Sequence, residues 1–294
     1  MNNNETQKGI IIKGIGGFYY VEASGTLLEC KPRGSFRHEG FKPVAGDYVT
    51  VEGDEGGYVI TEIDERINLL NRPAIANVSE ALIVVSSVDP VPNTVVIDTM
   101  CAFCVDEGIE PIIVLTKTDV QKIDDIRDIY TQAGFRVIDI MSENDSLKKL
   151  SDYLGTGIAV VIGNSGSGKS TLLNKINNEL DLVTGEISKK LGRGKHTTRE
   201  VTLYHFGEGF LADTPGFASL DILNICKNPD DLINLFPDLH EYADNCRFAD
   251  CSHTVENGCG VLNALQEGKI NPSRFSNYRD FYSKVRQKYA ARYK

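Results

Sequence analysis

The sequence Ile158-Ala-Val-Val-Ile-Gly163-Asn-Ser-Gly-Ser-Gly168-Lys169-Ser170-Thr171 joins an apolar run to a glycine-rich loop. The loop has the pattern G-x-x-x-x-G-K-[ST], and Leu172-Leu-Asn-Lys-Ile176 follows it at helical spacing. A strand, this loop and a helix predict a P-loop, in which backbone N–H groups and a helix N-terminus bind phosphate. We expect Lys169 to reach the β- and γ-phosphates and act in catalysis, and Ser170 to ligate Mg²⁺. The expected nucleotide-binding residues here are Gly163, Asn164, Ser165, Gly166, Ser167, Gly168, Lys169, Ser170 and Thr171.

A second element, Thr116-Lys117-Thr118-Asp119, follows the apolar run at residues 111–115. It is similar to the Asn-Lys-x-Asp element of GTPases, with Thr116 in the place of Asn. One carboxylate accepts the adjacent N1–H and N2–H₂ donors of guanine, which adenine does not offer. Asp119 therefore predicts GTP rather than ATP as the ligand, and we expect Lys117 to pack along the base.

A third element, Asp213-Thr-Pro-Gly216, follows the apolar pair Phe210-Leu211 and matches the D-x-x-G pattern of GTPases. We expect Asp213 to hold Mg²⁺ through a water molecule and the Gly216 N–H to sense the γ-phosphate. Ser142, after the strand expected at residues 137–140, is a further candidate for base contact.

Strands and helices alternate around these motifs. Residues 81–85, 111–115 and 158–162 are uniformly apolar, whereas residues 94–106 and 123–133 have helical spacing. Such alternation indicates a parallel sheet covered on both faces, with the loops at the carboxyl ends of its strands meeting at one edge. The Thr116–Asp119 element can therefore share a site with the P-loop although it precedes it, the reverse of the usual order. We predict a circularly permuted P-loop GTPase domain over residues 73–220.

The first part of the chain is predicted to be β-structure. Five short runs rich in β-forming residues, separated by glycine-containing turns, lie at residues 9–15, 18–21, 25–30, 47–51 and 58–63. This pattern predicts a small five-stranded barrel, an OB-fold or an SH3-like barrel, of which we favour the OB-fold. With a linker at residues 67–73, it forms a domain at residues 1–72.

The segment at residues 31–42 of this barrel combines cations with Phe36 and Phe41. Cations together with aromatic rings are typical of a groove for single-stranded nucleic acid, although a mobile polar loop has the same composition. The expected RNA contacts are Lys31, Arg33, Arg37 and Lys42.

Cysteine and histidine cluster near the other end of the chain, in the pattern Cys246-x4-Cys251-x-His253-x5-Cys259. Three thiolates and one imidazole form a closed ligand set for one structural Zn²⁺, with no open position for catalysis. We predict a mostly helical zinc-binding domain at residues 221–294, whose folding depends on the metal. The pair Cys101 and Cys104 falls in a helical stretch, and we expect both to be core residues.

The formal net charge of −10 argues weakly against nucleic-acid binding, but the charge is unevenly spread. Basic residues gather at residues 189–199 and along the tail from Lys269 to Lys294, which serves RNA docking or is a solvated helix face. Residues 1–8 are polar and the apolar runs are of strand length. We therefore expect no secretion signal, no transmembrane helix and a cytoplasmic protein.

The motif order, the barrel before it and the Cys/His cluster after it closely resemble the ribosome small-subunit-dependent GTPase A family. The resemblance covers nearly the whole chain and includes Gly192-Arg-Gly-Lys-His-Thr-Thr198, which looks like switch I of that family, and Gly258-Cys-Gly-Val261. It implies GTP hydrolysis with GDP as product, stimulation by the small (30S) ribosomal subunit, rRNA binding and a role in late subunit maturation. We expect the chain to act as a monomer.

Phe217 follows the D-x-x-G element, where many GTPases have a Gln that orients the attacking water. Phe has no hydrogen-bonding group, so the resemblance makes His196 the candidate for this catalytic role, or a partner completes the site. Of Thr197 and Thr198 we choose Thr198 as the further Mg²⁺ ligand. Two alternatives stay open: a P-loop ATPase or small-molecule kinase, and a nucleotide-gated RNA-binding module that barely hydrolyses.

Overall fold

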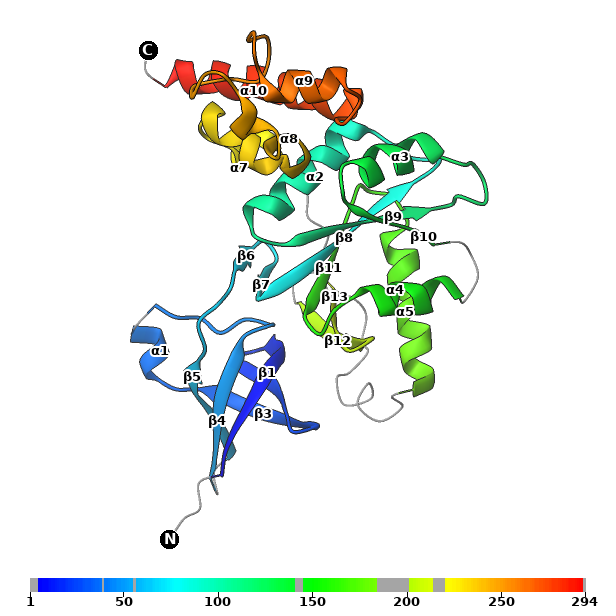
Figure 1. Ribbon diagram of the computed structural model, residues 1–294. Helices are drawn as coiled ribbons and strands as arrows, with labels where there is room; N and C mark the ends of the chain where they lie inside the picture. Colours follow the sequence, from blue (N-terminus) through cyan, green and yellow to red (C-terminus); the bar gives the residue numbers. More distant parts are fainter. Residues whose placement is uncertain are drawn as a thin grey trace. The chain divides into compact units, whose positions relative to one another are not determined.

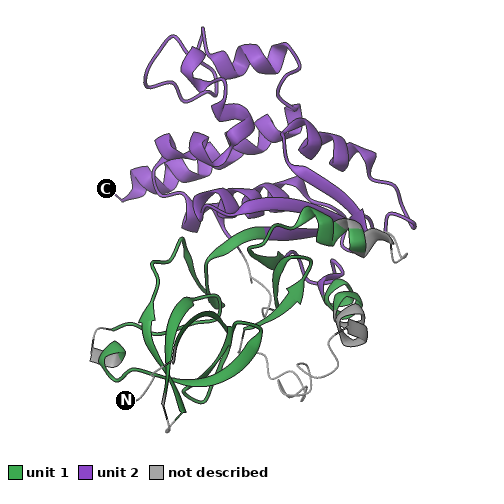
Figure 2. Cartoon of the chain, turned by 60° about the horizontal axis from the view of Figure 1, so that its bottom comes forward, with its two compact units in different colours: residues 1–80, 147–161, 170–217 green, residues 81–146, 162–169, 218–294 purple. Residues whose placement is uncertain are grey.

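The computed structural model describes residues 5–38, 40–54, 57–140, 145–183, 201–213 and 220–292 (Figure 1). Contacts divide the chain into two compact units (Figure 2). Unit 1 consists of residues 1–80, 147–161 and 170–217, and unit 2 of residues 81–146, 162–169 and 218–294. Within the described part of the chain, no helix is both long and apolar enough to cross a lipid bilayer.

The first part of unit 1 is a closed five-stranded barrel. Its strands are β1 (Glu5–Ile15), β2 (Phe18–Ala23), β3 (Thr26–Pro32), β4 (Tyr48–Asp54) and β5 (Gly57–Ile63). They run in the order β1-β2-β3-β5-β4, and β4 pairs back with β1. Only the β3–β5 pair is parallel among these neighbours. This order and closure confirm the predicted OB-fold. Side chains that face the interior fill the barrel, among them Ile11, Val21, Cys30, Val51 and Ile60.

Two structured pieces fall where the sequence predicted irregular segments. A single helical turn, α1 (Ser35–His38), lies between β3 and β4. The expected linker contains the strand β6 (Leu69–Asn71), which forms a hairpin with β7 (Ala74–Ala76). Each is one turn or three residues long, too short for a sequence period to show.

The rest of unit 1 carries strands of the GTPase sheet. The buried strand β11 (Ile158–Ile162) pairs in parallel with β13 (Gly209–Asp213), which pairs antiparallel with β12 (Thr202–Phe206). Helices α4 (Asp145–Tyr153) and α5 (Lys169–Val183) flank β11 in the chain. β12 also meets the barrel strand β1, at Thr202 and Lys13. The barrel and this part of the sheet are therefore hydrogen-bonded within one unit.

Unit 2 begins with a three-stranded sheet segment in the order β10-β9-β8, formed by β8 (Val78–Ser86), β9 (Glu110–Thr116) and β10 (Arg136–Ile140). β9 and β10 are parallel, and helices α2 (Thr94–Asp106) and α3 (Asp124–Gln132) connect the three strands. The Asn93 side chain caps α2 by accepting from the N–H groups of Val95 and Val96. These elements confirm the predicted strand–helix alternation, and the buried Cys101 and Cys104 confirm their assignment to the core.

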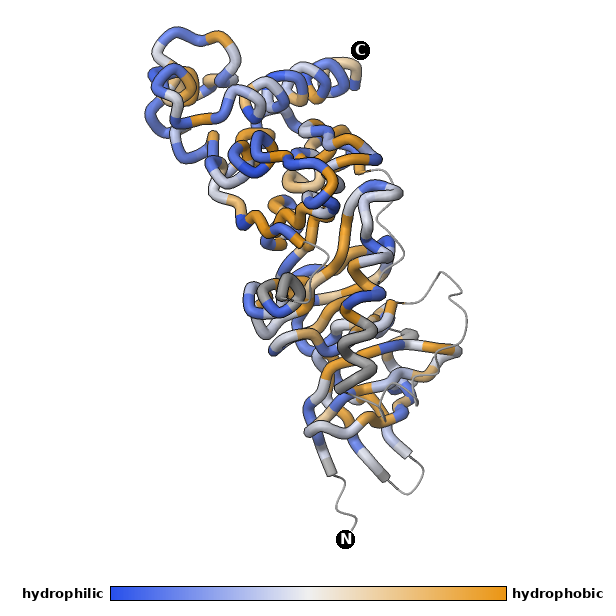
Figure 3. Tube along the Cα trace, turned by 90° about the vertical axis from the view of Figure 1, so that its right-hand side faces the viewer, coloured by the Kyte–Doolittle hydropathy of each residue, from blue (hydrophilic) through white to orange (hydrophobic). Residues whose placement is uncertain are grey.

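The C-terminal module of unit 2 consists of short helices packed on a long one. They are α7 (Ile222–Ile225), η1 (Pro229–Leu235), α8 (Pro237–His240), η2 (Ala243–Asn245), α9 (Gly260–Gln266) and α10 (Pro272–Ala291). Phe236, Tyr278 and Phe281 are fully buried in its core, which extends onto Ala102 of α2. In Figure 3 the central strands are coloured mostly hydrophobic, while the helix next to the C-terminus, α10, is coloured largely hydrophilic.

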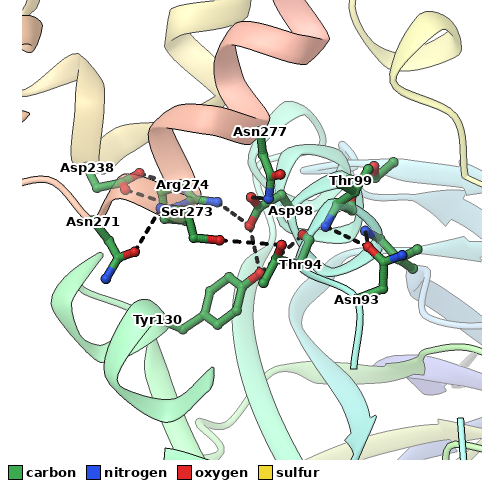
Figure 4. Close-up of polar contacts among 12 residues, drawn as sticks. Asn93, Thr94, Asp98, Thr99, Tyr130, Asp238, Asn271, Ser273, Arg274 and Asn277 are labelled. Atoms are coloured by element: carbon green, nitrogen blue, oxygen red, sulfur yellow. Dashed lines mark hydrogen bonds and ion pairs between the residues drawn. The ribbon is translucent and has the colours of Figure 1, made fainter. Parts of the chain in front are cut away.

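A buried polar cluster joins α10 to α2 (Figure 4). Arg274 is 1% exposed, and its guanidinium donates to Asp98 of α2 at 2.6 Å and to Asp238 of α8 at 2.6 Å. Asp98 also accepts from Tyr130 of α3 at 2.8 Å and from Asn277 of α10 at 2.6 Å. The cluster satisfies the buried charges with hydrogen bonds from four helices, as a low-dielectric interior requires.

Candidate functional site

The glycine-rich loop lies between β11 and α5, as its sequence predicts. Gly163, Gly166 and Gly168 have positive φ angles of 148°, 81° and 99°, a region that side chains disfavour. A Cβ at Gly163 would lie 2.6 Å from the carbonyl oxygen of Val84 in β8, so the loop passes directly against this strand. The glycines therefore allow both the curvature of the loop and its close approach to the sheet.

Lys169 begins α5 and folds back over the loop. Its Nζ donates to the carbonyls of Gly163 at 2.7 Å and Asn164 at 2.5 Å, and burial lowers the pKa of the ammonium. Ser170 and Thr171 follow in the first turn of α5 and are exposed. The positive end of the helix and the ammonium thus lie at one loop, the arrangement that binds an anionic phosphate chain.

The Thr116–Asp119 element contacts this loop directly. The Thr116 hydroxyl donates to the carbonyl of Ser167 at 2.9 Å, and the Lys117 Nζ donates to the carbonyl of Gly166 at 3.3 Å. Thr116 lacks the side-chain amide of Asn, but its hydroxyl still forms a hydrogen bond to the phosphate loop. Motifs far apart in the chain meet here, which is the arrangement that a permuted nucleotide site requires.

The element itself is a tight turn. The N–H of Val120 donates to the carbonyl of Lys117 at 2.9 Å, which leaves Thr118 and the exposed Asp119 at the centre of the turn. Two residues that were not predicted from the sequence hold Lys117. The Ser87 hydroxyl donates to the Lys117 carbonyl at 2.6 Å, and the Lys117 Nζ donates to the Asp89 carbonyl at 2.5 Å. Their position just after the apolar run at residues 81–85 was the available signal, because strand ends share one edge.

Several predicted site residues fall outside the described residues, namely Ser142, His196, Thr198 and Gly216. Asp213 is the last residue of β13, so its backbone is described and its side chain is not. Their nucleotide, magnesium and catalytic roles remain predictions.

The four predicted zinc ligands come together. Their ligand atoms all lie within 4.8 Å of one another. The His253 Nδ1 lies 3.3 Å from the Cys246 Sγ and 3.6 Å from the Cys259 Sγ, and these two sulfurs are 3.7 Å apart. A tetrahedral ion with Zn–S bonds of about 2.3 Å and Zn–N bonds of about 2.0 Å spaces its ligands by about 3.5–3.8 Å. The cluster of Cys246, Cys251, His253 and Cys259 can therefore hold a zinc ion.

Glu256 organises the loop between the zinc-ligand candidates. Its carboxylate accepts from the N–H groups of Ser252, Thr254 and Val255 at 3.0 Å, and from the Ser252 hydroxyl. Burial raises the pKa of Glu256, but these hydrogen bonds outweigh that effect and lower it to about 2. A charged carboxylate therefore closes the turn that presents His253, which itself has a positive φ of 58°.

The predicted RNA contacts lie on or beside the barrel. Lys31, Arg33 and Lys42 are exposed, whereas only the backbone of Arg37 is described, in α1. The two aromatic residues of this segment differ: Phe41 is 52% exposed, but Phe36 is buried in the barrel core. Phe36 therefore does not present its ring to a base, because the helical turn of α1 directs it inward. The Lys31 Nζ instead lies 5.3 Å from the ring centre of Phe18.

A strand–loop–helix unit for phosphate, in contact with a T-K-x-D turn from an earlier part of the chain, defines a circularly permuted P-loop GTPase. Comparison with protein families agrees with this class. The RsgA GTPase model matches residues 63–223, and the RsgA N-terminal domain model matches residues 8–59. The chain belongs to the RsgA GTPase family and is a GTP-hydrolysing enzyme.

Relatives of the chain cover nearly its whole length. The small ribosomal subunit biogenesis GTPase RsgA of Halalkalibacterium halodurans is 40% identical over 97% of this chain and 99% of its own. The protein of the same name from Clostridium perfringens is 39% identical over 95% and 96%.

Two solved structures are similar to this chain over nearly its whole length. YloQ, described as a circularly permuted GTPase, has a TM-score of 0.81 at 32% identity and covers 96% of both chains. YjeQ from Thermotoga maritima has a TM-score of 0.77 at 30% identity, covering 96% of this chain and 99% of its own.

Proposed function

We propose that this GTPase acts as a conformational switch in late maturation of the small ribosomal subunit, and that the subunit and its rRNA stimulate hydrolysis. The observation that carries the GTPase chemistry is the hydrogen-bonded contact of Thr116 and Lys117 with the phosphate loop. Support for the biological setting comes from relatives about 40% identical over almost the full chain, which carry the name small ribosomal subunit biogenesis GTPase. The setting in the cell would be the cytoplasm, with the protein as a monomer.

For nucleotide binding, we propose that the backbone amides of residues 163–168 and the Lys169 ammonium grip the phosphates. The Asp119 carboxylate accepts the two guanine donors, and Ser142 adds a base contact. Ser170, Thr198 and Asp213 would hold Mg²⁺, which neutralises charge on the phosphate oxygens when it is bound. The hydrogen bonds of Thr116 and Lys117 with the phosphate loop would set the distance between the base site and the phosphate site before the nucleotide binds.

For hydrolysis, Phe217 leaves the attacking water without the usual Gln, so another group must orient it. We propose His196 for this role, with the bound small subunit completing the site. The Gly216 N–H binds the γ-phosphate in the GTP state. When hydrolysis removes this phosphate, Gly216 loses its partner, and the conformation of the segment that leads into the C-terminal module changes.

For RNA docking, we propose Lys31, Arg33, Arg37 and Lys42 as the barrel contacts, with the zinc-holding domain as a second contact region. We retain the division into residues 1–72, 73–220 and 221–294 as the functional one. The ring of Phe41 is 52% exposed, with the Arg66 guanidinium 5.7 Å from its centre, so we propose that its open face stacks on a base.

GTP turnover measured alone, with small subunits, with naked rRNA and with large subunits tests this function. We expect strong stimulation by small subunits, a weaker effect of naked rRNA and none by large subunits. Lys169→Ala abolishes turnover in every condition because the phosphate chain loses its cation. Equal rates in all four conditions would contradict the assignment to the small subunit, and absence of turnover would favour a nucleotide-gated RNA-binding module.

Nucleotide choice is tested by Asp119→Asn, with the exposed Asp125→Asn as matched control. An amide presents a donor to the guanine N–H groups, so GTP binding weakens by about 100-fold or more, while xanthosine triphosphate, which carries an acceptor there, gains. Competition binding with GTP, XTP and ATP measures this exchange. Unchanged GTP affinity in Asp119→Asn, or strong ATP binding by the natural chain, would support an ATPase or kinase instead.

A further inference from the structure

Ser87 lies directly after β8 and is buried, with 1% of its surface exposed. Its N–H donates to the carbonyl of Thr116 at 3.0 Å, and its Oγ donates to the carbonyl of Lys117 at 2.6 Å. Two consecutive residues of the guanine-recognition turn are therefore held from the same neighbouring residue.

The carbonyl of Lys117 determines the shape of this turn. It accepts the N–H of Val120 at 2.9 Å, with the N–H of Gln121 at a longer 3.3 Å, so it closes the turn whose central residues are Thr118 and Asp119. The Ser87 hydroxyl donates to the same oxygen at 2.6 Å, so this carbonyl is held both by N–H groups of the turn and by a side chain from outside it.

The backbone of Lys117 needs such support. Its φ angle is +57°, in the left-handed region that residues with a side chain rarely adopt. The Ser87 hydroxyl holds the carbonyl side of this residue, and the Asp89 and Gly166 carbonyls hold its ammonium. The Asp119 side chain is exposed, so the turn rather than packing sets the direction of its carboxylate.

We propose that Ser87 is a positioning residue for guanine specificity: its hydroxyl fixes the Lys117 carbonyl and, through the turn, the direction of the Asp119 carboxylate. This inference rests on the proposed role of Asp119 as the guanine acceptor. Ser87 itself does not touch the base; it acts through the backbone of the turn.

The experiment compares dissociation constants for GDP and for IDP, which lacks the N2 amino group, across matched variants. Ser87→Ala removes the hydroxyl and Ser87→Thr retains it. Ser79→Ala is the control, because Ser79 lies on β8, the strand that precedes Ser87, and its hydroxyl also donates to a backbone carbonyl, that of Ile158 at 3.2 Å. Asp119→Asn reports the loss of the acceptor itself.

We expect Ser87→Ala to weaken GDP binding by about tenfold and to shrink the GDP-over-IDP preference, because loss of one such bond misdirects a two-donor contact. Ser87→Thr restores the preference and Ser79→Ala retains it, whatever their melting temperatures. Equal loss of GDP and IDP affinity in Ser87→Ala would assign Ser87 to stability alone and overturn the inference.

Failure of the inference can be told apart from failure of the guanine assignment. If Asp119→Asn abolishes the preference while Ser87→Ala keeps it, only the role of Ser87 is refuted. If the natural chain binds GDP and IDP equally and Asp119→Asn changes nothing, both are refuted together.

Discussion

Gly163 marks the closest approach between the phosphate loop and the neighbouring strand. An added Cβ would lie 2.6 Å from the Val84 carbonyl oxygen and 2.9 Å from the Ser167 Oγ, and the φ angle of 148° disfavours a side chain. The Val84 oxygen belongs to the backbone of β8, so the backbone would have to shift. Its conformation, and not only its size, makes glycine necessary here.

We predict that Gly163→Ala lowers the free energy of unfolding by about 1–3 kcal/mol and abolishes tight nucleotide binding, because the loop must move away from β8. Gly34→Ala is the control, since its backbone is not in the left-handed region and a Cβ there meets nothing within 4 Å. Denaturant melts and GDP titration measure both effects. A Gly163→Ala protein with unchanged stability and affinity would show that the loop tolerates the added carbon.

For individual residues, the sequence predicted the motifs but not the residues that hold those motifs in place. The P-loop and the Thr116–Asp119 turn have recognisable patterns, whereas Ser87 is one serine after a strand. Its role arises from pairing between β8 and the end of β9, so its place after a predicted strand points to the site but not to the residue that it contacts. Phe36 shows the same limit: its neighbours are cationic and polar, yet the turn of α1 points it into the core.

Among the elements, the helix α10 carries basic residues in two different environments, exposed and buried, which its composition alone does not distinguish. By composition alone, Arg274 belongs to the basic tail from Lys269 to Lys294, which is predicted to dock RNA or to be a solvated helix face. The structure corrects this, because Arg274 is buried between Asp98 and Asp238. Burial would lower its pKa, but the two carboxylates raise it, so the guanidinium stays charged. The helix was predictable, but not this residue, whose partner on α2 is 176 positions away in the chain.

We predict that Arg274→Met destabilises the protein by about 3–5 kcal/mol, because Asp98 and Asp238 lose their shared counter-charge in the interior. The exposed Arg279→Met on the same helix is the control and should change stability by less than about 0.5 kcal/mol. Urea unfolding followed by circular dichroism measures the difference. Equal stabilities of the two variants would mean that the buried pairs contribute nothing net.

For the molecule as a whole, the order of strands and helices was predictable because each has a clear period, and the barrel and the permuted GTPase fold followed from that order. Contacts between distant segments were not. The pairing of β1 with β12 at Lys13 and Thr202, and the hydrogen bond between the His205 Nε2 and the Glu22 carboxylate at 2.8 Å, join the barrel to the GTPase sheet. Such contacts depend on tertiary placement, which hydrophobic patterns do not encode.

We predict that a zinc-selective chelator, with Mg²⁺ kept in excess, lowers the melting temperature and also reduces GTP turnover. The ligand loop loses its structure without metal, and its module shares a core with α2, which follows β8 of the nucleotide site. Calorimetry and phosphate release measure the two effects, and added Zn²⁺ should reverse both. Full turnover by a metal-free, partly unfolded protein would show that the nucleotide site is independent of the module.

The cluster around Arg274 has a consequence for attempts to dissect the protein. A chain shortened to end before α10 would lack both Arg274 and Asn277, leaving the Asp98 carboxylate with Tyr130 as its remaining side-chain donor among the contacts described above. Such a fragment would lack the buried partners of Asp98 and would expose the apolar side of α2 to water. The helix α10 therefore stabilises the unit that also contains the phosphate loop. Removing this helix would damage that unit and would not yield an intact GTPase fragment.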